Sequence, residues 1–460
     1  MKKSHRMDML QGPLLKNIIL FALPIALSSI LQQLFNAADT AVAGRFGSPD
    51  ALAAVGTNGE IVALIVGLSA GLAVGANVRI AHFIGAGEQK KIPDVIHTGM
   101  LFSVLYGVLF GALGQLISKP LLLLIHTPAD ILTSADNYLR IYFAGVPFLM
   151  IYNFGAAILR AKGDSKRPLG ALIFSGVINV FLNLFFVVVC KLSVVGVALA
   201  TDLSTAVSAA MVVFWLLREH EEFRLSLRKL KLNRQHLQAI LRIGIPAAIQ
   251  SAVFCIANIF VQSAINTFGS AAAAGVAVSM NFEYIAYYMD TAFGQAATTF
   301  ISQNYAAGNR QRCKKTVGIC FLAATLFSAV IIVPVVLFSR QASGLFTTSS
   351  EEITYACERI RIILGLQVIC SCYEIPAWSM RGLGYSTLPA AETMLGICAV
   401  RILWLFTVFA RFGTLKSLYF SFPFTWVITS TMILITFFVV WRKAFRSNHS
   451  IQREAKVLLK

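Results

Sequence analysis

One acidic side chain lies within the first long apolar segment of the chain and has the clearest capacity for chemistry. Asp39 follows Gln32 by seven residues and Asn36 by three, so the three side chains share one face of a helix. A charged group in a bilayer costs roughly 2.5–3.5 kcal/mol on insertion scales, so Asp39 needs a partner or a function. We expect Asp39 to bind a proton or a cation. The structural alternative is that it pairs with Arg45 or caps a broken helix.

Oxygen-bearing side chains in two later segments could complete such a site. Asn179 and Asn183 are four residues apart on one helical face, and Thr201 lies in the next segment with Asp202 beside it. A desolvated Na⁺ needs several oxygen ligands, and the same groups would hold a proton on a buried carboxyl. The sequence leaves H⁺ and Na⁺ both open. Hydrogen bonding between helices is the alternative role of the Asn and Thr side chains.

The second half of the chain carries a different polar pattern. Glu283, Tyr287 and Asp290 are spaced i, i+4, i+7, and Glu374 lies in a later segment. An acidic and aromatic face along a cavity would attract a lipophilic cation through ion pairing and cation–π contacts. A solvated wall that contacts no substrate is the alternative. Over both halves, the expected cavity residues are Gln32, Gln250, Asn258, Gln262, Glu283, Tyr287, Asp290 and Glu374.

A repeated element organises the segments that hold these residues. The pattern Arg-x-x-Gly-x-Ser-x-x-Pro occurs twice, 221 residues apart. Its residues are Arg160, Gly163 and Pro168 in the first copy and Arg381, Gly384 and Pro389 in the second. The glycine suits a sharp turn, the proline starts the next helix, and the arginine can hold terminal carbonyls or lipid headgroups. The chain is therefore two copies of one half.

Composition places both halves in a membrane. The chain has 57% hydrophobic residues, 13% charged residues and a mean hydropathy of +0.73, which excludes an ordinary soluble domain. About twelve apolar segments are long enough to cross a hydrocarbon core of roughly 30 Å. Six spans per half make the copies parallel. We expect an all-α polytopic membrane protein with two six-helix lobes, at 1–217 and 241–442, a cytoplasmic linker at 218–240 and a cytoplasmic tail at 443–460.

The charge pattern gives an orientation. Basic residues gather before the first span, in the linker and after the last span, so both termini are expected to be cytoplasmic. The net charge of +18 then reflects topology and anionic lipid, not nucleic acid. The eight cysteines lie mostly inside predicted spans, so neither a disulfide nor a metal site is indicated. No nucleophile–base pair or phosphate loop indicates an enzyme.

Taken together, these features resemble the MATE transporters and, within them, the prokaryotic DinF-like branch. The resemblance implies a V-shaped pair of lobes, alternating access, and export of drugs or other amphipathic cations against inward H⁺ or Na⁺. It also implies a monomer in the bacterial plasma membrane that needs no cofactor. The cation-site residues of the family carry over to Asp39, Asn179 and Thr201. An Asp of the family falls on Asn183 here, and Val261 stands where NorM-like members have a further acid.

The nearest rival class is a lipid-linked oligosaccharide flippase of the polysaccharide-exporter or MurJ type. Such a flippase should line its cavity with Arg or Lys to bind pyrophosphate. Inside the predicted spans, acids are more frequent than bases, with Arg79 and Arg401 as exceptions. This balance favours an exporter of cations.

Overall fold

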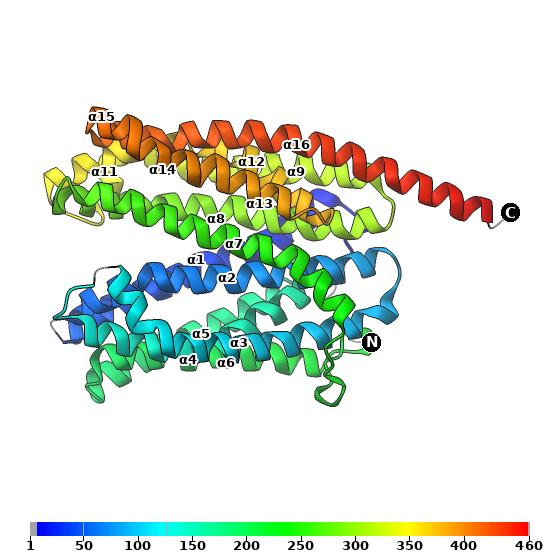
Figure 1. Cartoon of the computed structure of the whole chain (residues 1–460), viewed down its shortest axis with the longest axis horizontal. Helices are drawn as coiled ribbons and strands as arrows, with labels where there is room; N and C mark the ends of the chain where they lie inside the picture. The colour runs from blue at the N-terminus through cyan, green and yellow to red at the C-terminus, as the bar shows by residue number, and fades with distance from the viewer. Residues whose placement is uncertain (1–6, 49, 126, 459–460) are drawn as a thin grey trace. The chain divides into compact units, whose positions relative to one another are not determined.

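The structure, a computed structural model, describes residues 7–48, 50–125 and 127–458, and these residues form helices and no strands (Figure 1). The first repeat contains α1 (Leu14–Phe46), α2 (Ala51–Gly85), α3 (Ile92–Leu124), α4 (Leu132–Lys162), α5 (Lys166–Leu184) and α6 (Ser193–Leu217). The second contains α7 (Arg234–Asn266), α8 (Ser270–Ala306), α9 (Arg310–Leu337), α10 (Ser339–Gly344), α11 (Ser350–Ile362), α12 (Cys370–Gly382), α13 (Thr387–Thr393), α14 (Val400–Trp404), α15 (Ala410–Phe412) and α16 (Leu415–Leu458).

Several of the shorter helices join into single spans. A 3₁₀ segment, Leu364–Ile369, links α11 to α12, and two π-helical segments, Met394–Ala399 and Leu405–Phe409, flank α14. A third π-helical segment, Phe185–Val189, extends α5. Such π segments often occur at functional sites, because they change the direction in which side chains point.

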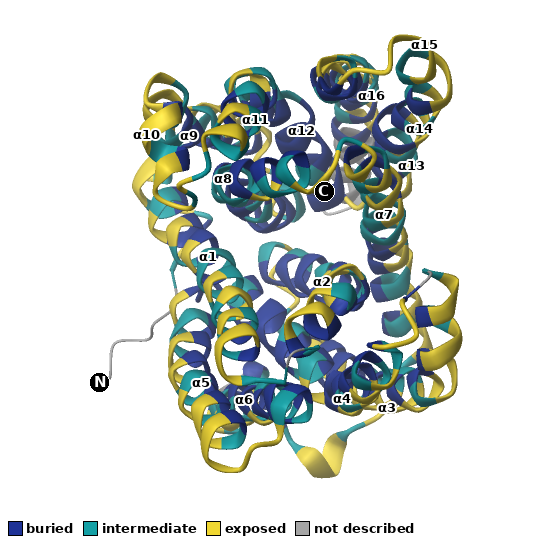
Figure 2. Ribbon diagram, turned by 90° about the vertical axis from the view of Figure 1, so that its left-hand side faces the viewer, coloured by how far each residue is buried: buried dark blue, intermediate teal, exposed yellow. Residues whose placement is uncertain are grey.

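Eleven helical segments of the described chain are long and apolar enough to cross a membrane. The twelfth predicted span, 273–304, lies within α8, which has 37 residues and carries Glu283 and Asp290. Large apolar side chains such as Leu116 and Phe406 are exposed. Exposed and buried positions alternate along many of the helices, as the colours of Figure 2 show. Exposed apolar surface of this extent is typical of helices that contact lipid. The expected all-α membrane fold is confirmed.

The repeated element forms the same turn in both halves. Gly163 after α4 has φ 100° and Gly384 after α12 has φ 91°, both in the left-handed region that glycine tolerates. The amide of Gly163 donates to the Arg160 carbonyl, and the amide of Gly384 donates to the Arg381 carbonyl, at 2.9 Å each. This is one bond of the Schellman arrangement that ends a helix. Pro168 and Pro389 follow in the first turns of α5 and α13.

The two arginines of the element, which were expected to hold terminal carbonyls or lipid headgroups, both form hydrogen bonds with side chains of the protein. Arg381 is only 3% exposed, lies 4.4 Å from the Trp378 ring centroid and donates Nη2 to Gln250 Oε1. Arg160 forms a side-chain hydrogen bond with Tyr152. Each arginine sits at the end of a helix that is already packed against its neighbours, so its guanidinium group meets protein before it reaches lipid.

Contacts divide the chain into two compact units whose boundaries fall inside helices, not in the linker. The first unit holds Leu27–Ala248, and the second holds Asp8–Ala26 together with Ile249 onward. Both boundaries lie two residues after a helix proline, Pro24 in α1 and Pro246 in α7. The units therefore differ from the lobe ranges expected from the sequence.

Close packing and hydrogen bonds explain this exchange of helix ends. In the first unit, a Cβ added to Gly75 would lie 2.0 Å from the Ile240 carbonyl oxygen. The backbones of α2 and of the start of α7 therefore approach each other closely at Gly75, which has no side chain. In the second unit, Arg312 of α9 donates Nε to the Met9 carbonyl at 3.0 Å and Nη2 to the Gln11 carbonyl at 2.8 Å. Each unit thus holds the beginning of the helix that opens the other repeat.

A charged cluster outside the spans joins the end of α4, the start of α5 and the linker. Glu219 accepts hydrogen bonds from Lys162 Nζ and from Arg167 Nη2. Arg167 Nε also pairs with Asp164. Burial opposes the charged form of Glu219, but the bonds from Lys162 and Arg167 outweigh it and hold the pKa of the carboxyl below its usual value.

We expect Glu219→Gln to lower the thermal unfolding midpoint by a few degrees at neutral pH. Removing the charge-assisted bonds should cost about 1–3 kcal/mol. Because the folded-state pKa is lowered, this stabilisation is present above the unfolded carboxyl pKa of about 4.3 and is lost as the pH falls through the folded value. Thermal unfolding of the detergent-solubilised protein between pH 7 and 3.5 measures the difference, which should shrink in acid. Glu222→Gln, in the same linker, is the control; an equal loss in both variants would contradict the prediction.

Candidate ion-coupling site and cavity

Two helices, α5 and α6, bring polar side chains to Asp39 of α1, which is only 4% exposed. Thr201 of α6 donates Oγ1 to Asp39 Oδ2 at 2.9 Å. Asn183 of α5 donates Nδ2 to Asp39 Oδ1 and also to Asn179 Oδ1, the latter at 3.1 Å. Four residues singled out in the sequence as a possible ion site therefore form one hydrogen-bonded cluster within the first unit.

The cluster retains one unused acceptor. Asn183 lies two residues before the π-helical segment that extends α5 and is fully buried. Its Oδ1 is buried and accepts no hydrogen bond from the described residues. Buried polar atoms without partners are rare and call for a bound water, ion or proton. With the carboxylate of Asp39, this oxygen offers the ligand type that a hard cation prefers.

Two side chains of the first span lie away from the cluster. Asn36 is exposed, and its carbonyl accepts a hydrogen bond from Thr40 Oγ1 at 2.9 Å. Its side chain forms no hydrogen bond with Asp39, so Asn36 lies outside the cluster although it was expected on the same helical face. Arg45 lies 5.9 Å from the Phe46 ring centroid and forms no ion pair with any described residue. Asp39 bonds to α5 and α6, whereas Asn36 is displaced by about 60° around the helix and about 4.5 Å along it, so the two residues need not meet the same neighbours. Gln32 is half-buried and also lies outside the hydrogen-bonded cluster.

Asp202 is adjacent to Thr201 in sequence but faces another helix. It accepts a hydrogen bond from the backbone of Gly145 in α4, and a Cβ added to that glycine would lie 2.0 Å from Asp202 Oδ1. The structure thus separates Asp202 from the direct partners of Asp39.

The sequence reasoning missed two tyrosines on α4. Tyr138 and Tyr142 are buried, have stacked rings with centroids 6.3 Å apart, and lie within electrostatic range of both Asp39 and Asp202. The spacing of two tyrosines four residues apart in an apolar segment could have indicated this polar helix face from the sequence. Both tyrosines therefore lie in the neighbourhood of the two acids, in the first unit.

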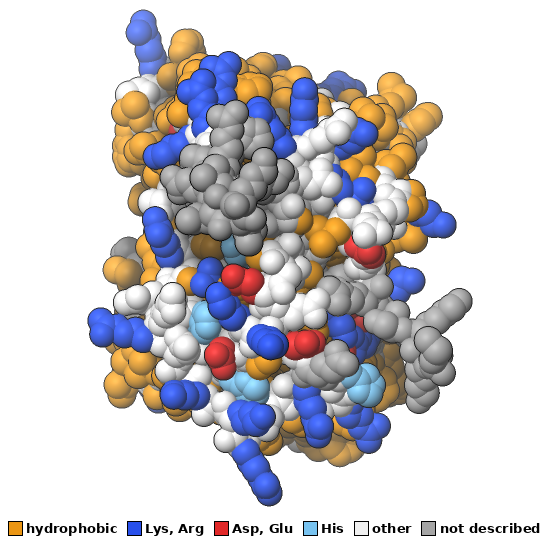
Figure 3. All heavy atoms as spheres, turned by 90° about the vertical axis from the view of Figure 1, so that its right-hand side faces the viewer, with side chains coloured by type: hydrophobic (Ala, Val, Ile, Leu, Met, Phe, Trp, Pro, Cys, Tyr) orange, Lys and Arg blue, Asp and Glu red, His pale blue; other side chains and the backbone are white. Residues whose placement is uncertain are grey.

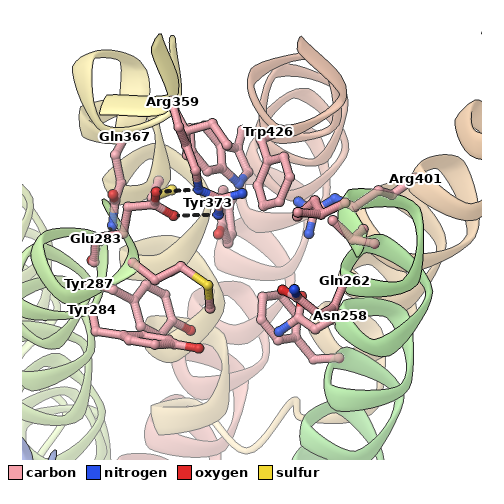
Figure 4. A pocket seen from close by; sticks show the side chains of 17 residues that line it. Asn258, Gln262, Glu283, Tyr284, Tyr287, Arg359, Gln367, Tyr373, Arg401 and Trp426 are labelled. Atoms are coloured by element: carbon pink, nitrogen blue, oxygen red, sulfur yellow. Dashed lines mark hydrogen bonds and ion pairs between the residues drawn. The ribbon is translucent and has the colours of Figure 1, made fainter. Parts of the chain in front are cut away.

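The second unit contains a cavity of about 120 Å³. This is well above the roughly 10–15 Å³ that one water needs. Of the residues expected to line a cavity, four do: Asn258, Gln262, Glu283 and Tyr287 (Figure 4). Gln250 instead accepts a hydrogen bond from Arg381.

Asp290 and Glu374 lie outside this lining and join α8 to α12. Asp290 is fully buried and accepts a hydrogen bond from Ser371 Oγ. Glu374 accepts bonds from Tyr287 Oη at 3.0 Å and from Trp378 Nε1 at 2.8 Å. The acidic face expected from the i, i+4, i+7 spacing is therefore divided, because only Glu283 and Tyr287 reach the cavity.

The charge of Glu283 is already paired. Arg359 donates Nε to Glu283 Oε1 at 2.7 Å and Nη2 to Oε2 at 2.8 Å, and Ser279 adds a bond at 2.7 Å. Arg401 also lines the cavity. The expected excess of acid is wrong for this pocket, where two arginines face one glutamate. Arg359 was not recognised because it lies near the beginning of its span, where an arginine ordinarily reaches the membrane surface.

Repeated helical halves with exposed apolar faces and interior polar clusters are those of a polytopic membrane protein. Among the described residues, no group of three or more His, Cys, Asp and Glu side chains could hold a metal ion.

A family model described as MatE matches residues 24–185 and again 246–407, once in each half. The chain therefore belongs to the MATE family, whose members are transporters and not enzymes. This confirms the resemblance seen in the sequence and the two-repeat architecture.

The sequences of known relatives align with most of the length of this chain. The chain is 28% identical to the probable multidrug resistance protein YoeA of Bacillus subtilis, over 93% of this chain and 94% of the relative. It is 23% identical to an FAD transporter of Shewanella oneidensis, over 77% of this chain and 79% of the relative. A solved MOP superfamily transporter from Pyrococcus furiosus superposes with a TM-score of 0.85 at 22% identity, covering 98% of this chain and 100% of that one. The last comparison shows the fold alone.

Proposed function

We propose that this MATE protein is a secondary active antiporter that exports amphipathic or cationic small molecules in exchange for inward H⁺ or Na⁺. The observation that carries the proposal is the buried Asp39 cluster, in which Asn183 and Thr201 donate to a carboxylate inside a membrane span. An ionisable group held this way is costly, so it is typical of ion pathways and coupling sites. The names of the relatives, as multidrug resistance proteins, support small-molecule export.

Coupling requires that ion binding favour one conformation over another. Uptake of a proton or cation by Asp39 from outside would change which oxygens accept from Asn183 and Thr201. Span one would then bend near Pro24, because a proline lacks the amide hydrogen of a helix hydrogen bond, and the bend would expel substrate from the first lobe. Release of the ion inside resets the lobe. One charge moving through 100 mV supplies about 2.3 kcal/mol, or about a 50-fold bias.

We place the protein in a bacterial plasma membrane with both termini in the cytoplasm. The support is the Lys and Arg residues before the first span, in the linker and after the last span. Lys and Arg side chains are more frequent than acidic ones on the face drawn in Figure 3. Loops rich in Lys and Arg remain on the cytoplasmic side of a membrane.

Transport into proteoliposomes tests the proposal. Purified protein is reconstituted, a pH gradient or a Na⁺ gradient is imposed separately, and movement of ethidium is followed by fluorescence. Movement driven by the pH gradient alone establishes proton coupling, and movement driven by Na⁺ alone establishes a Na⁺ site. Absence of movement under both gradients would overturn the proposal and direct the search to lipid-linked oligosaccharides.

A further inference from the structure

One arginine in the cavity of the second unit is buried without a counter-ion. Arg401 is 1% exposed, and its guanidinium carbon lies 3.9 Å from the ring centroid of Phe422. The guanidinium group of Arg401 makes one hydrogen bond to the described residues, from Nη2 to Thr425 Oγ1 at 3.3 Å, and its Nε is buried without an acceptor. No described carboxylate lies within ion-pair distance of Arg401. A buried charge without a partner is strongly unfavourable, so this one calls for an anion.

Two further residues of the pocket lining, Arg359 and Gln367, each have one buried polar atom without a hydrogen-bond partner among the described residues. Arg359 uses Nε and Nη2 on Glu283, but its Nη1 is buried without an acceptor, and Gln367 Oε1 is buried without a donor. Arg359 also lies against Phe422, 5.2 Å from the ring centroid. Figure 4 shows the Glu283–Arg359 pair on one side of the pocket and Arg401 on the other.

The charges of the lining do not cancel. Glu283 offsets Arg359, which leaves the positive charge of Arg401 uncompensated. Arg401 lies in α14, between two π-helical segments. The lining also presents the aromatic rings of Tyr284, Tyr287 and Trp426.

We propose that this pocket is an anion subsite that binds the carboxylate of an aromatic, amphipathic substrate. Arg401 supplies the ion pair, and the tyrosine and tryptophan rings pack on the apolar part. A guanidinium group matches the geometry of a carboxylate with two parallel donors. The inference rests on the proposed export function and refines its substrate class: zwitterions and anions are bound in preference to simple cations.

Binding of a matched pair of dyes tests this subsite. Full-length protein in nanodiscs is titrated with a zwitterionic rhodamine that has a free benzoate group, and with the methyl ester of that dye, which is a cation. We expect the wild type to bind the free acid about tenfold more tightly, equivalent to about 1.4 kcal/mol. In Arg401→Gln the ratio of the two affinities should fall to about one, and Arg401→Lys should restore part of the preference. Arg411→Gln, an exposed arginine of α15, is the control and should retain the full ratio.

A competition measurement needs no variant and so covers the case in which Arg401→Gln fails to fold. Benzoate should displace the zwitterionic dye from the wild type at concentrations at which benzyl alcohol does not. Equal wild-type affinities for the two dyes, equal competition by both compounds, or a preference that survives in folded Arg401→Gln would each overturn the subsite.

Export assays separate this inference from the proposed function. If the ester moves under an ion gradient but the free acid is not preferred, the subsite fails and the export function stands. If the free acid is preferred but neither dye moves under any gradient, the export function fails and the subsite stands.

Discussion

Asp39→Asn is expected to reduce gradient-driven dye export at least tenfold, to the level of liposomes without protein. An amide is nearly the same size as a carboxylate, but it neither takes up a proton near neutral pH nor provides a negative charge for Na⁺. The amide has one acceptor oxygen in place of two, so it can accept from Asn183 Nδ2 or from Thr201 Oγ1 but not from both, and its hydrogen bonds no longer respond to the ion gradient. Initial rates of ethidium movement in proteoliposomes, at matched protein content, measure the effect.

Two variants show whether the loss is specific. Glu60→Gln removes a different carboxylate of the first unit, on α2, and should retain export. Thr201→Val removes one donor to Asp39 and should reduce export less than Asp39→Asn does. Size-exclusion profiles establish that each variant is folded. Coupled export at the wild-type rate in folded Asp39→Asn would disprove the role of Asp39.

Gly75→Ala should destabilise the first unit by about 1–3 kcal/mol, the usual cost of overpacking. The added methyl group would stand 2.0 Å from the carbonyl oxygen of Ile240, which belongs to the backbone of α7 and cannot rotate away. The start of α7 would have to move from α2. Thermal unfolding of the purified protein should show a midpoint lower by several degrees.

Gly59→Ala is a matched control in the same helix. Nothing lies within 4 Å of a Cβ added at Gly59, and alanine is the better helix former. We expect its unfolding midpoint to be unchanged or slightly raised. A midpoint for Gly75→Ala at or above that of Gly59→Ala would show that the α2–α7 contact is looser than described.

Composition and repetition were sufficient to predict the fold class. Long apolar segments can satisfy their backbone only as helices in a membrane, and an offset of 221 residues relates Gly163 to Gly384, both of which adopt left-handed φ. The prediction of one polar cluster around Asp39 relied on the cost of burying a carboxyl, which made any nearby Asn and Thr a candidate partner.

Partners across helices were harder to predict, because sequence spacing gives the face of a helix but not the neighbour of that face. Asn36 shares a face with Asp39 yet is exposed, and Asp202 adjoins Thr201 yet accepts from Gly145. Glu283 was expected to attract cations, but Arg359, 76 residues further along the chain, neutralises it.

The sequence alone therefore determined that this is a duplicated, all-helical membrane protein with a costly acid in its first span, because hydropathy and repeat offset are properties of the chain itself. Only the tertiary structure decided which unit holds the beginnings of α1 and α7, where Asp202 points, and the excess of positive charge in the cavity of the second unit. Those outcomes depend on how helices rotate and approach one another. Arg359 and Arg401, for example, give the cavity its positive charge, and only the packing of their helices brings both of them against Phe422.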